Sequence, residues 1–345
     1  MNSVERVMTA LDGGTPDRVP ILEFIIDQKV WRALVPQAGD MAEAMDVLGF
    51  DGVGCGAQFD RIKAFDDGRY EDEWGVLYKE GVEAVAHPIS GPIETMEDAL
   101  AYEPPDPQAP HRLGKLPDVV ARYKGKRAIC FHHRAAFMWS AYLMGMEGIL
   151  MALLSEPELA TTVLDKVLAA NMAVVRRAIR AGAEVIVLGD DYASNIGPMF
   201  SPAIFNEFIA PRLEAMVSMI HEEGARVIKH TDGNVYDLLD GIVACGADGF
   251  NPIEPVAGMS LAEVRRRVPP TFCLCGNIDC GELLSHGTPA AVRETVRQAM
   301  IDGGREGAFI LSSSNSIHSS CDPVNVQAMV DACHEFGEYP VDTRE

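Results

Sequence analysis

Eight short apolar runs, separated by longer amphipathic stretches, constrain the fold of this chain more than any other feature of the sequence. Parallel strands joined by crossover helices give this pattern, because each strand is buried on both faces and each helix on only one. The runs lie at residues 20–24, 51–55, 128–132, 185–189, 227–230, 249–253, 272–276 and 308–312. They predict an α/β fold, a closed (β/α)8 TIM barrel, and none is followed by the GxGxxG of a dinucleotide-binding sheet.

Helix starts between the runs are marked by a capping residue followed by proline, as in Ser201-Pro202, Thr288-Pro289 and Asp322-Pro323. Residues 1–18 predict an N-terminal helix that stops at a pair of glycines and caps the bottom of the barrel. Residues 57–126 form a long insertion after the second strand and include a predicted hairpin, "YEDEWGVLYKEG". We interpret this insertion as a lid or wall of the site within a single domain, 1–345.

Charge and cysteine content limit the classes of function. The net charge of −22 argues against sequence-independent binding of nucleic acid or of an anionic membrane, since both need clustered lysine and arginine. The eight cysteines form no CxxC pair, which is typical of a reducing compartment, and the N-terminus has no signal-peptide pattern. Residues 137–154 are the most membrane-like segment, and we interpret them as a buried helix. A cytoplasmic enzyme is expected.

Polar side chains stand near the ends of nearly all the predicted strands. Because the carboxyl ends of barrel strands share one mouth, these residues are expected to meet there. They are Glu23, Asp27, Cys55, His132, His133, Asp190, Asp191, His230, Asp232, Glu254, Cys275, Asn277, Asp279, Asn315 and His318.

Four of these residues are candidate metal ligands. His230 and Asp232 are two apart on an extended end, so they can face one cation or act as a base and an acid. Glu254 would complete a His/Asp/Glu set suited to zinc with an open fourth position, and Cys275 offers a thiolate. The alternatives are an Asp-Gly-Asn turn with a satisfied histidine, a surface ion pair for Glu254 and a buried structural cysteine.

Other residues of the mouth are candidates for catalysis and substrate binding. Asp190 and Asp191 form a like-charge pair that can raise one pKa or hold a substrate hydroxyl, unless Asp191 only caps a turn. The polar loop with Asn315 and His318 can donate hydrogen bonds to an anion, although ordinary turn chemistry explains it equally well. Residues 132–134, His-His-Arg, offer cations for a carboxylate, or else a stacked pair of histidines. We assign catalysis to Asp190, Asp191 and His318, and substrate binding to His132, His133, Asn277 and Asn315.

Several stretches along the chain resemble the uroporphyrinogen decarboxylase superfamily, which includes zinc-dependent methyltransferases that pass methyl groups to and from corrinoid proteins. They include "ERVMTALDGGTPDRVPI", "SAYLMGMEG", "SPAIFNEFIAPRL", "KHTDGNVYDLLDGIVACGADGFNPIEP" and "SIHSSCDPVNVQAMVDA". The resemblance implies a (β/α)8 barrel with its active site at the carboxyl end of the strands. Tyr142 stands where the decarboxylases keep a tyrosine, so the resemblance adds it to the catalytic candidates.

The resemblance favours the methyltransferase branch. True decarboxylases carry an arginine-rich "RQAGR" after the first strand, and this chain has "ILEFIIDQKVW" there. The coenzyme M methyltransferases hold zinc with His-x-Cys and a later cysteine, where this chain has His230-x-Asp232 and Asn315. A zinc with carboxylate ligands is a stronger Lewis acid than one with thiolates and suits an oxygen substrate.

The sequence therefore predicts a methyltransferase that moves a methyl group from a small O-methylated substrate to a corrinoid protein, with zinc as Lewis acid. A metal-free decarboxylase of a small carboxylic acid is the alternative, and a non-catalytic binding barrel is the third hypothesis. Family barrels often dimerise, so a homodimer is also expected.

Overall fold

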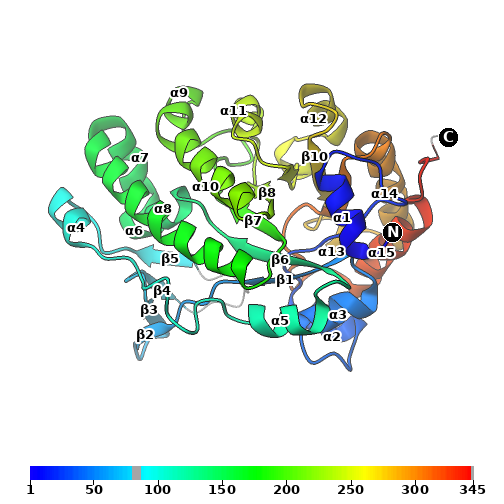
Figure 1. Cartoon of the computed structure of the whole chain (residues 1–345), viewed down its shortest axis with the longest axis horizontal. Coiled ribbons are helices and arrows are strands. Elements are labelled where there is room, and N and C mark those ends of the chain that lie inside the picture. The colour runs from blue at the N-terminus through cyan, green and yellow to red at the C-terminus, as the bar shows by residue number, and fades with distance from the viewer. Residues whose placement is uncertain (80–86, 343–345) are drawn as a thin grey trace.

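A parallel sheet of seven strands, in the order β1-β6-β7-β8-β9-β10-β11, curls into a half-barrel at the centre of the chain (Figure 1). The computed structural model describes residues 1–79 and 87–342. The strands are β1 (Gly52–Gly56), β6 (Ala128–His133), β7 (Val185–Gly189), β8 (Arg226–His230), β9 (Gly249–Asn251), β10 (Cys273–Ile278) and β11 (Phe309–Ser313). Each overlaps one of the predicted apolar runs, so the α/β class and the parallel sheet are confirmed.

Helices connect successive strands of the sheet and cover its outer side (Figure 1). After β6 come α6 (Phe137–Met144), α7 (Met146–Ser155) and α8 (Pro157–Arg180); after β7 come α9 (Pro202–Ile204), the π-helix η1 (Phe205–Ile209) and α10 (Ala210–Glu222). The later ones are α11 (Leu239–Ala244), η2 (Pro255–Ala257), α12 (Leu261–Arg267), α13 (Leu283–His286), α14 (Pro289–Gly304) and α15 (Pro323–Phe336). Ser201, Thr288 and Asp322 cap α9, α14 and α15 through their side chains, as predicted.

No single described helix has the length and apolar composition needed to cross a membrane. The pair α6 and α7 passes that test only when both helices are counted together, and they are bent by 104° relative to each other. In the structure α6 is largely buried: Phe137, Leu143 and Trp139 all belong to the main hydrophobic core.

The first predicted strand, residues 20–24, forms only a short contact with its neighbours. Leu311 donates its N–H to the carbonyl of Pro20 (2.9 Å), Leu22 donates to that of Leu311 (3.0 Å), and Ile21 accepts from Asp51 (2.9 Å). The next donor in a parallel ladder would be the N–H of Ser313, but it bonds the Glu23 side chain instead (2.6 Å). A side chain thus ends the pairing and leaves residues 20–22 as a link between β1 and β11.

Residues 57–126 contribute a second, antiparallel sheet and two helices. The sheet has the order β2-β3-β4-β5, with β2 (Arg61–Ala64), β3 (Arg69–Asp72), β4 (Leu77–Lys79) and β5 (His87–Ser90). The pairing of β3 with β4 confirms the described part of the predicted hairpin, whose last two residues, 80 and 81, lie outside the described residues. The helices are α4 (Met96–Ala101) and α5 (Leu116–Tyr123). The small sheet lies at the end of the molecule opposite α1 (Figure 1).

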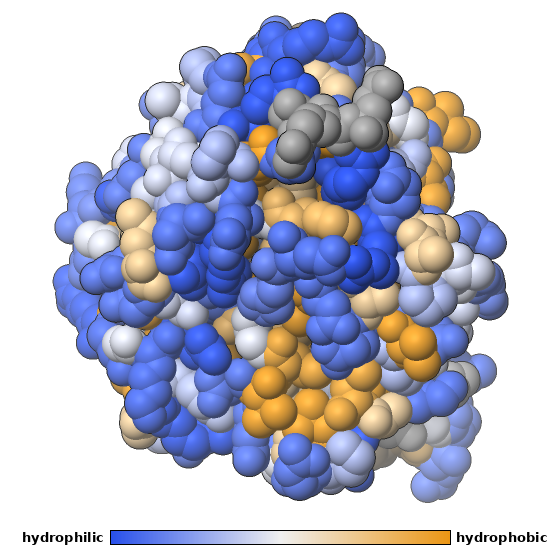
Figure 2. All heavy atoms as spheres, turned by 90° about the vertical axis from the view of Figure 1, so that its right-hand side faces the viewer, coloured by the Kyte–Doolittle hydropathy of each residue, from blue (hydrophilic) through white to orange (hydrophobic). Residues whose placement is uncertain are grey.

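The N-terminal helix α1 (Ser3–Leu11) packs against the central sheet, on the side of the molecule away from the small sheet. Val7, Ala10 and Leu11 join side chains from the interior of the sheet, among them Ile228 and Ile310, in one buried cluster. The short helices α2 (Gln28–Leu34) and α3 (Met41–Leu48) precede β1. Figure 2 views the side of the molecule that carries α1 and shows mostly hydrophilic side chains with smaller hydrophobic areas between them.

A buried carboxylate ties α1 and the first segment to the start of β1. Asp51 is fully buried, and it accepts from Arg6 (2.7 Å), from Arg18 (2.9 Å) and from the N–H of Ile21 (3.0 Å). We expect Asp51→Ala to lower the free energy of unfolding by ~3–5 kcal/mol, because Arg6 would be left buried with half of its ion pairs missing. The measurement is the urea unfolding transition of wild type and variant.

A matched control is Asp67→Ala on the surface. Asp67 also pairs with an arginine, Arg69, at 2.7 Å, but its side chain is 55% exposed. Exposed pairs of this kind are screened by water and contribute little to stability, so the unfolding transition should barely move. Equal losses in the two variants would contradict a structural role for the buried network.

Candidate active site

A cavity of about 730 Å³ opens at the carboxyl end of the central strands, within the size range of small-molecule sites. Side chains from the segments after the strands line it, together with Ala57, Phe59 and Pro88 from the 57–126 region. The polar and charged residues that line the cavity are Glu23, His132, His133, Arg134, Tyr142, Asp191, His230, Asp232, Asn251, Ser313, Asn315 and Ser316. The prediction that strand ends would share one polar mouth is consistent with this cavity.

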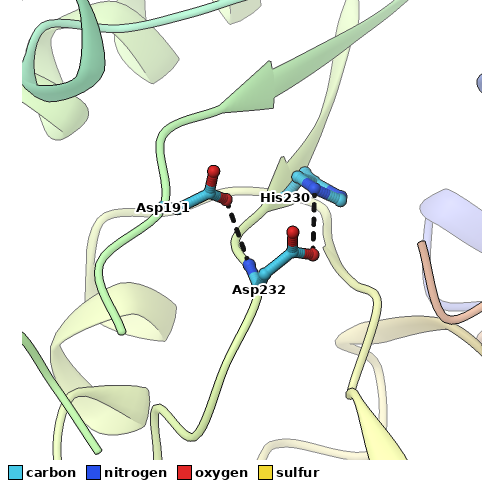
Figure 3. Close-up of side chains that lie close together, drawn as sticks. All are labelled: Asp191, His230 and Asp232. Carbon is cyan, nitrogen blue, oxygen red and sulfur yellow. Dashed lines mark hydrogen bonds and ion pairs between the residues drawn. The ribbon is translucent and has the colours of Figure 1, made fainter. Parts of the chain in front are cut away.

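Asp191, His230 and Asp232 form a compact cluster in the cavity wall (Figure 3). They follow or end the neighbouring strands β7 and β8, and one ligand atom of each lies within 4.8 Å of the others. His230 Nε2 is 3.3 Å from Asp232 Oδ1, and the N–H of Asp232 donates to Asp191 Oδ1 at 3.1 Å. Parallel strands at adjacent register bring these residues together although 41 positions separate Asp191 from Asp232.

Two amides hold the cluster in place. Asn251 Oδ1, at the end of β9, lies 2.5 Å from His230 Nδ1 and therefore fixes the proton on that nitrogen. Asn315 donates its amide to Asp232 Oδ2 at 2.7 Å. As a result Nε2 of His230 and Oδ1 of Asp232 face each other, and Oδ1 has no hydrogen-bond partner among the described residues.

The two carboxyl groups of the cluster favour a positive charge beside them. Burial alone would lower the pKa of His230, but Asp232 and Asp191 outweigh burial and raise that pKa to about 9. Burial likewise opposes ionisation of Asp232, yet the positive charge of His230, whose Nε2 lies 3.3 Å from Oδ1, outweighs burial and leaves the pKa of Asp232 below its usual value. Two carboxylates beside one imidazole therefore bind a cation, which is either a proton on His230 or a metal ion.

The donor set fits zinc. Zinc takes histidine nitrogen and carboxylate oxygen at ~2.0–2.2 Å, so tetrahedral ligand atoms are ~3.3–3.5 Å apart. The 3.3 Å between His230 Nε2 and Asp232 Oδ1 matches such an edge, and Asp191 supplies a third oxygen. Asn251 is the kind of hydrogen-bond partner that orients a metal-binding histidine. His230, Asp232 and Asp191 are therefore the residues that would hold the ion.

Glu23 places a neutral carboxyl group in the same cavity. It is 3% exposed, and burial raises its pKa to about 8 against the hydrogen bonds of Ser313. Ser313 donates its N–H to Oε1 (2.6 Å), and its Oγ lies 2.8 Å from Oε2. The same hydroxyl also bonds the carbonyl of Asn315. One hydroxyl proton cannot serve both acceptors, so the second contact requires a proton on Glu23 itself.

Asp190 has a different place from its neighbour Asp191. Its carboxylate is 1% exposed and accepts three backbone N–H groups at the start of α6: those of Ala136 (2.9 Å), Phe137 (3.0 Å) and Met138 (3.1 Å). Burial raises the pKa of Asp190, while the nearby Lys229 acts in the opposite direction. Its oxygens are thus used as a helix cap, and Asp190 is not among the residues that line the cavity. A role for Asp190 in handling substrate or protons stays a prediction.

Four other predicted residues line the cavity. Tyr142 accepts a hydrogen bond from Arg134 (3.3 Å), and Asn315 contacts the cluster as described above. His133 is buried and His132 is partly buried, and burial lowers their pKa values to about 3 and about 4, so both rings are neutral. The Nε2 atom of each ring is buried and has no hydrogen-bond partner among the described residues.

The remaining four predicted residues are not brought to the cavity wall. Glu254 accepts from the N–H of Gly233 (2.8 Å), behind the turn that carries Asp232. Cys275 is fully buried inside the sheet, since β10 continues to Ile278 and does not end beside it. The others, Asn277 and His318, bond the carbonyl of Ile253 and the N–H of Ser320. Neither Glu254 nor Cys275 belongs to the cluster, so their role as metal ligands stays a prediction.

Three contributors to the site were not assigned a role from the sequence. Asn251 was placed inside a strand that was expected to reach residue 253, whereas β9 ends at Asn251 itself. Glu23 stood among the strand-end residues, but its neutral state depends on burial and on Ser313. Trp139 stacks on Trp74 at 4.4 Å, and only the folded insertion brings those rings together.

Comparison with known proteins identifies the family to which the chain belongs. Residues 76–336 match the family described as uroporphyrinogen decarboxylase (URO-D). The uroporphyrinogen decarboxylase of Aeromonas salmonicida is 26% identical over 258 residues, 71% of this chain and 70% of that protein. The enzyme of Pseudoalteromonas translucida is 27% identical over 185 residues, 53% of this chain and 50% of that protein. The chain thus spans about half the length of several curated relatives that it matches.

Solved structures support the fold. A methyltransferase from Methanosarcina mazei superimposes with a TM-score of 0.77 at 18% identity, covering 97% of this chain and 99% of that one. At this identity the likeness concerns the fold alone. With a family match that extends over most of its length, the chain belongs to the uroporphyrinogen decarboxylase family.

Proposed function

We propose that this protein is a methyltransferase that takes a methyl group from a small O-methylated substrate and passes it to a corrinoid carried on a partner protein. The observation that carries the proposal is the cluster of Asp191, His230 and Asp232 in the cavity wall. Its oxygen-rich donor set suits a Lewis acid that acts on an oxygen substrate. The likeness of fold to a methyltransferase over nearly the whole chain supports the same reading.

In this proposal the barrel is closed by residues 20–24, α1 caps its bottom, and residues 57–126 form a wall of the site. Phe59 and Pro88, from the insertion, line the cavity, which supports its role as a wall. A wall of this kind lets a small substrate be enclosed on one side while the other stays open to the large methyl acceptor.

The residues of the chain would divide the work. Bound zinc supplies a Lewis acid that stabilises negative charge on the departing oxygen. His230, Asp232 and Asp191 would hold that ion, and Asn251 and Asn315 would orient the ligands through their hydrogen bonds to His230 and Asp232. When the methyl–oxygen bond breaks, its electron pair stays on oxygen and the methyl group goes to the corrinoid. Glu23, the neutral carboxyl group in the same cavity, gives its proton to that oxygen.

A metal-free decarboxylase is the second candidate, and the curated relatives' names favour it. In that case the high pKa of His230 makes it an imidazolium paired with Asp232, and the pair would stabilise charge as carbon dioxide leaves. No arginine-rich segment follows the first strand in the sequence, so a small acid rather than a porphyrin would be the substrate.

The two functions differ in metal content and in product. For the methyltransferase we expect about one zinc per chain by elemental analysis, and transfer of methyl from methoxy compounds to a cob(I)alamin acceptor. Activity should disappear on chelation and return with zinc. Release of carbon dioxide from small acids by the metal-free protein, without methyl transfer, would refute the proposal in favour of the decarboxylase.

A further inference from the structure

Arg134 is the only arginine or lysine among the described residues that line the cavity. It follows β6 directly and is half-buried. Its side chain donates to the hydroxyl of Tyr142 at 3.3 Å, and its guanidinium carbon lies 5.3 Å from the ring centre of Tyr142 and 5.7 Å from that of Trp139. The two aromatic rings therefore hold the cation at the cavity wall without neutralising it.

Arg134 is unusual because it lines the cavity without an acidic partner among the described residues. The chain has 51 acidic residues, yet no carboxylate among the described residues pairs with this side chain. Arg177 and Arg265 also lack carboxylate partners, but backbone carbonyls occupy their donors, as at Ala308 (2.8 Å) for Arg265. A guanidinium has five N–H donors in a planar fork that matches a carboxylate, and most of those of Arg134 remain free.

The neighbouring histidines do not share this charge. His132 and His133 precede Arg134, and burial lowers their pKa values so that both are neutral. The acidic side chains Asp191 and Asp232 also line the cavity and disfavour an anion beside them. The charge of a substrate carboxylate is thus directed to Arg134, and its other end to the metal cluster.

Apolar and aromatic side chains also line the cavity. Phe24, Phe59, Met138 and Trp139 line it. Trp139 is fixed by stacking on Trp74 at 4.4 Å and by the edge of Phe59 at 5.2 Å. Rigid rings of this kind suit a flat aromatic ligand.

We infer that Arg134, with Tyr142 and Trp139, forms a carboxylate-binding subsite, and that the methyl donor is an aromatic carboxylate carrying a methoxy group. The inference rests on the proposed function for the methoxy end of the substrate, and on the cavity alone for the carboxylate end. It narrows the substrate class from small methyl ethers to anionic ones.

The test compares 4-methoxybenzoate with its neutral analogue 4-methoxybenzamide, using calorimetric titration of the full, zinc-loaded chain. Wild type should bind the carboxylate ~10–100-fold more tightly than the amide, since hydrogen bonds to charged groups are the stronger ones. Arg134→Gln should abolish this preference and leave amide binding unchanged. Tyr142→Phe should weaken carboxylate binding only ~2–10-fold. Arg305→Gln, at an exposed arginine outside the cavity, should match wild type.

Two results would overturn the subsite: no binding of 4-methoxybenzoate, or an unchanged preference in Arg134→Gln. Failure of the proposed function is seen separately, because titration needs neither corrinoid nor methyl transfer. If carboxylate binding depends on Arg134 but no methyl group moves, the subsite stands and the methyltransferase proposal fails. If methyl transfer occurs but wild type and Arg134→Gln prefer the carboxylate over the amide equally, the methyltransferase proposal stands and the subsite fails.

Discussion

Replacing His230 with alanine should leave the protein folded but remove its bound zinc and lower kcat/KM for methyl transfer by ~10³-fold or more. Histidine supplies the only nitrogen ligand of the cluster, and the two remaining carboxylates would face each other without it. A Lewis acid contributes several kcal/mol to charge stabilisation, and each ~1.4 kcal/mol is a factor of ten in rate. The measurements are zinc content per chain and kcat/KM before and after addition of zinc.

A graded series separates metal binding from general damage. Asn251→Ala removes the partner of His230 Nδ1, and we expect zinc affinity to fall ~10–100-fold with recovery of activity at high zinc. His286→Ala changes an exposed histidine outside the cavity and should retain both zinc and activity. Full methyl transfer by His230→Ala would exclude the cluster as the catalytic centre.

The sheet could be predicted because the pattern that specifies it is local. Seven apolar runs are strands within two residues at each end, and three Ser/Thr/Asp-Pro starts cap helices as expected. The run at 20–24 differs because its pairing ends at a long-range contact, in which Glu23 takes the N–H of Ser313. That contact joins residues 290 positions apart, and periodicity carries no information about it.

The sequence predicted those residues of the site whose position depends only on where a strand ends. His230, Asp232 and Asp191 meet because they follow neighbouring parallel strands, which spacing alone can indicate. Asp190 differs from Asp191 by one position, and alternation along the chain turns its carboxylate toward the start of α6. The predicted end of β9 was two residues too late, so Asn251 was not recognised as a strand-end residue. The predicted end of β10 was two residues too early, so Cys275 was wrongly placed near the end of its strand. The ends of strands are the feature that is predicted least accurately from a sequence, and in this protein they determine which side chains reach the cavity.

Charge is divided between two regions of the cavity. The cluster at β7 and β8 combines two carboxylates with one histidine and favours a cation, whereas Arg134 offers a positive charge that no carboxylate among the described residues pairs with. Glu23 stays neutral at ordinary pH because it is buried. An anionic substrate can therefore approach without repulsion from Glu23, and the carboxyl group holds a proton for use when negative charge develops on the substrate.

Glu23→Gln should lower kcat by ~10²–10³-fold while leaving substrate binding within a few fold, because it removes a proton donor and little else. Glutamine keeps the shape of a neutral carboxyl group: its oxygen can accept from the N–H of Ser313 and its NH₂ can donate to Ser313 Oγ. The measurement is the pH dependence of kcat. In wild type the rate should fall as pH rises through about 8, where Glu23 loses its proton, and the variant should lack this decline.

The pH dependence of the free energy of unfolding tests the protonation state of Glu23 without an activity assay. The folded pKa of Glu23, about 8, lies above its ordinary value of 4.5, so the folded state holds an extra proton between these two pH values. Stability should therefore fall with rising pH across that window, by ~1.4 kcal/mol per pH unit from this group, and be unaffected by it outside the window. Urea unfolding of wild type and Glu23→Gln at pH 5, 6, 7 and 8, roughly spanning the window, isolates the difference. Parallel pH profiles of the two proteins would show that Glu23 is ionised in the fold and cannot be the proton donor.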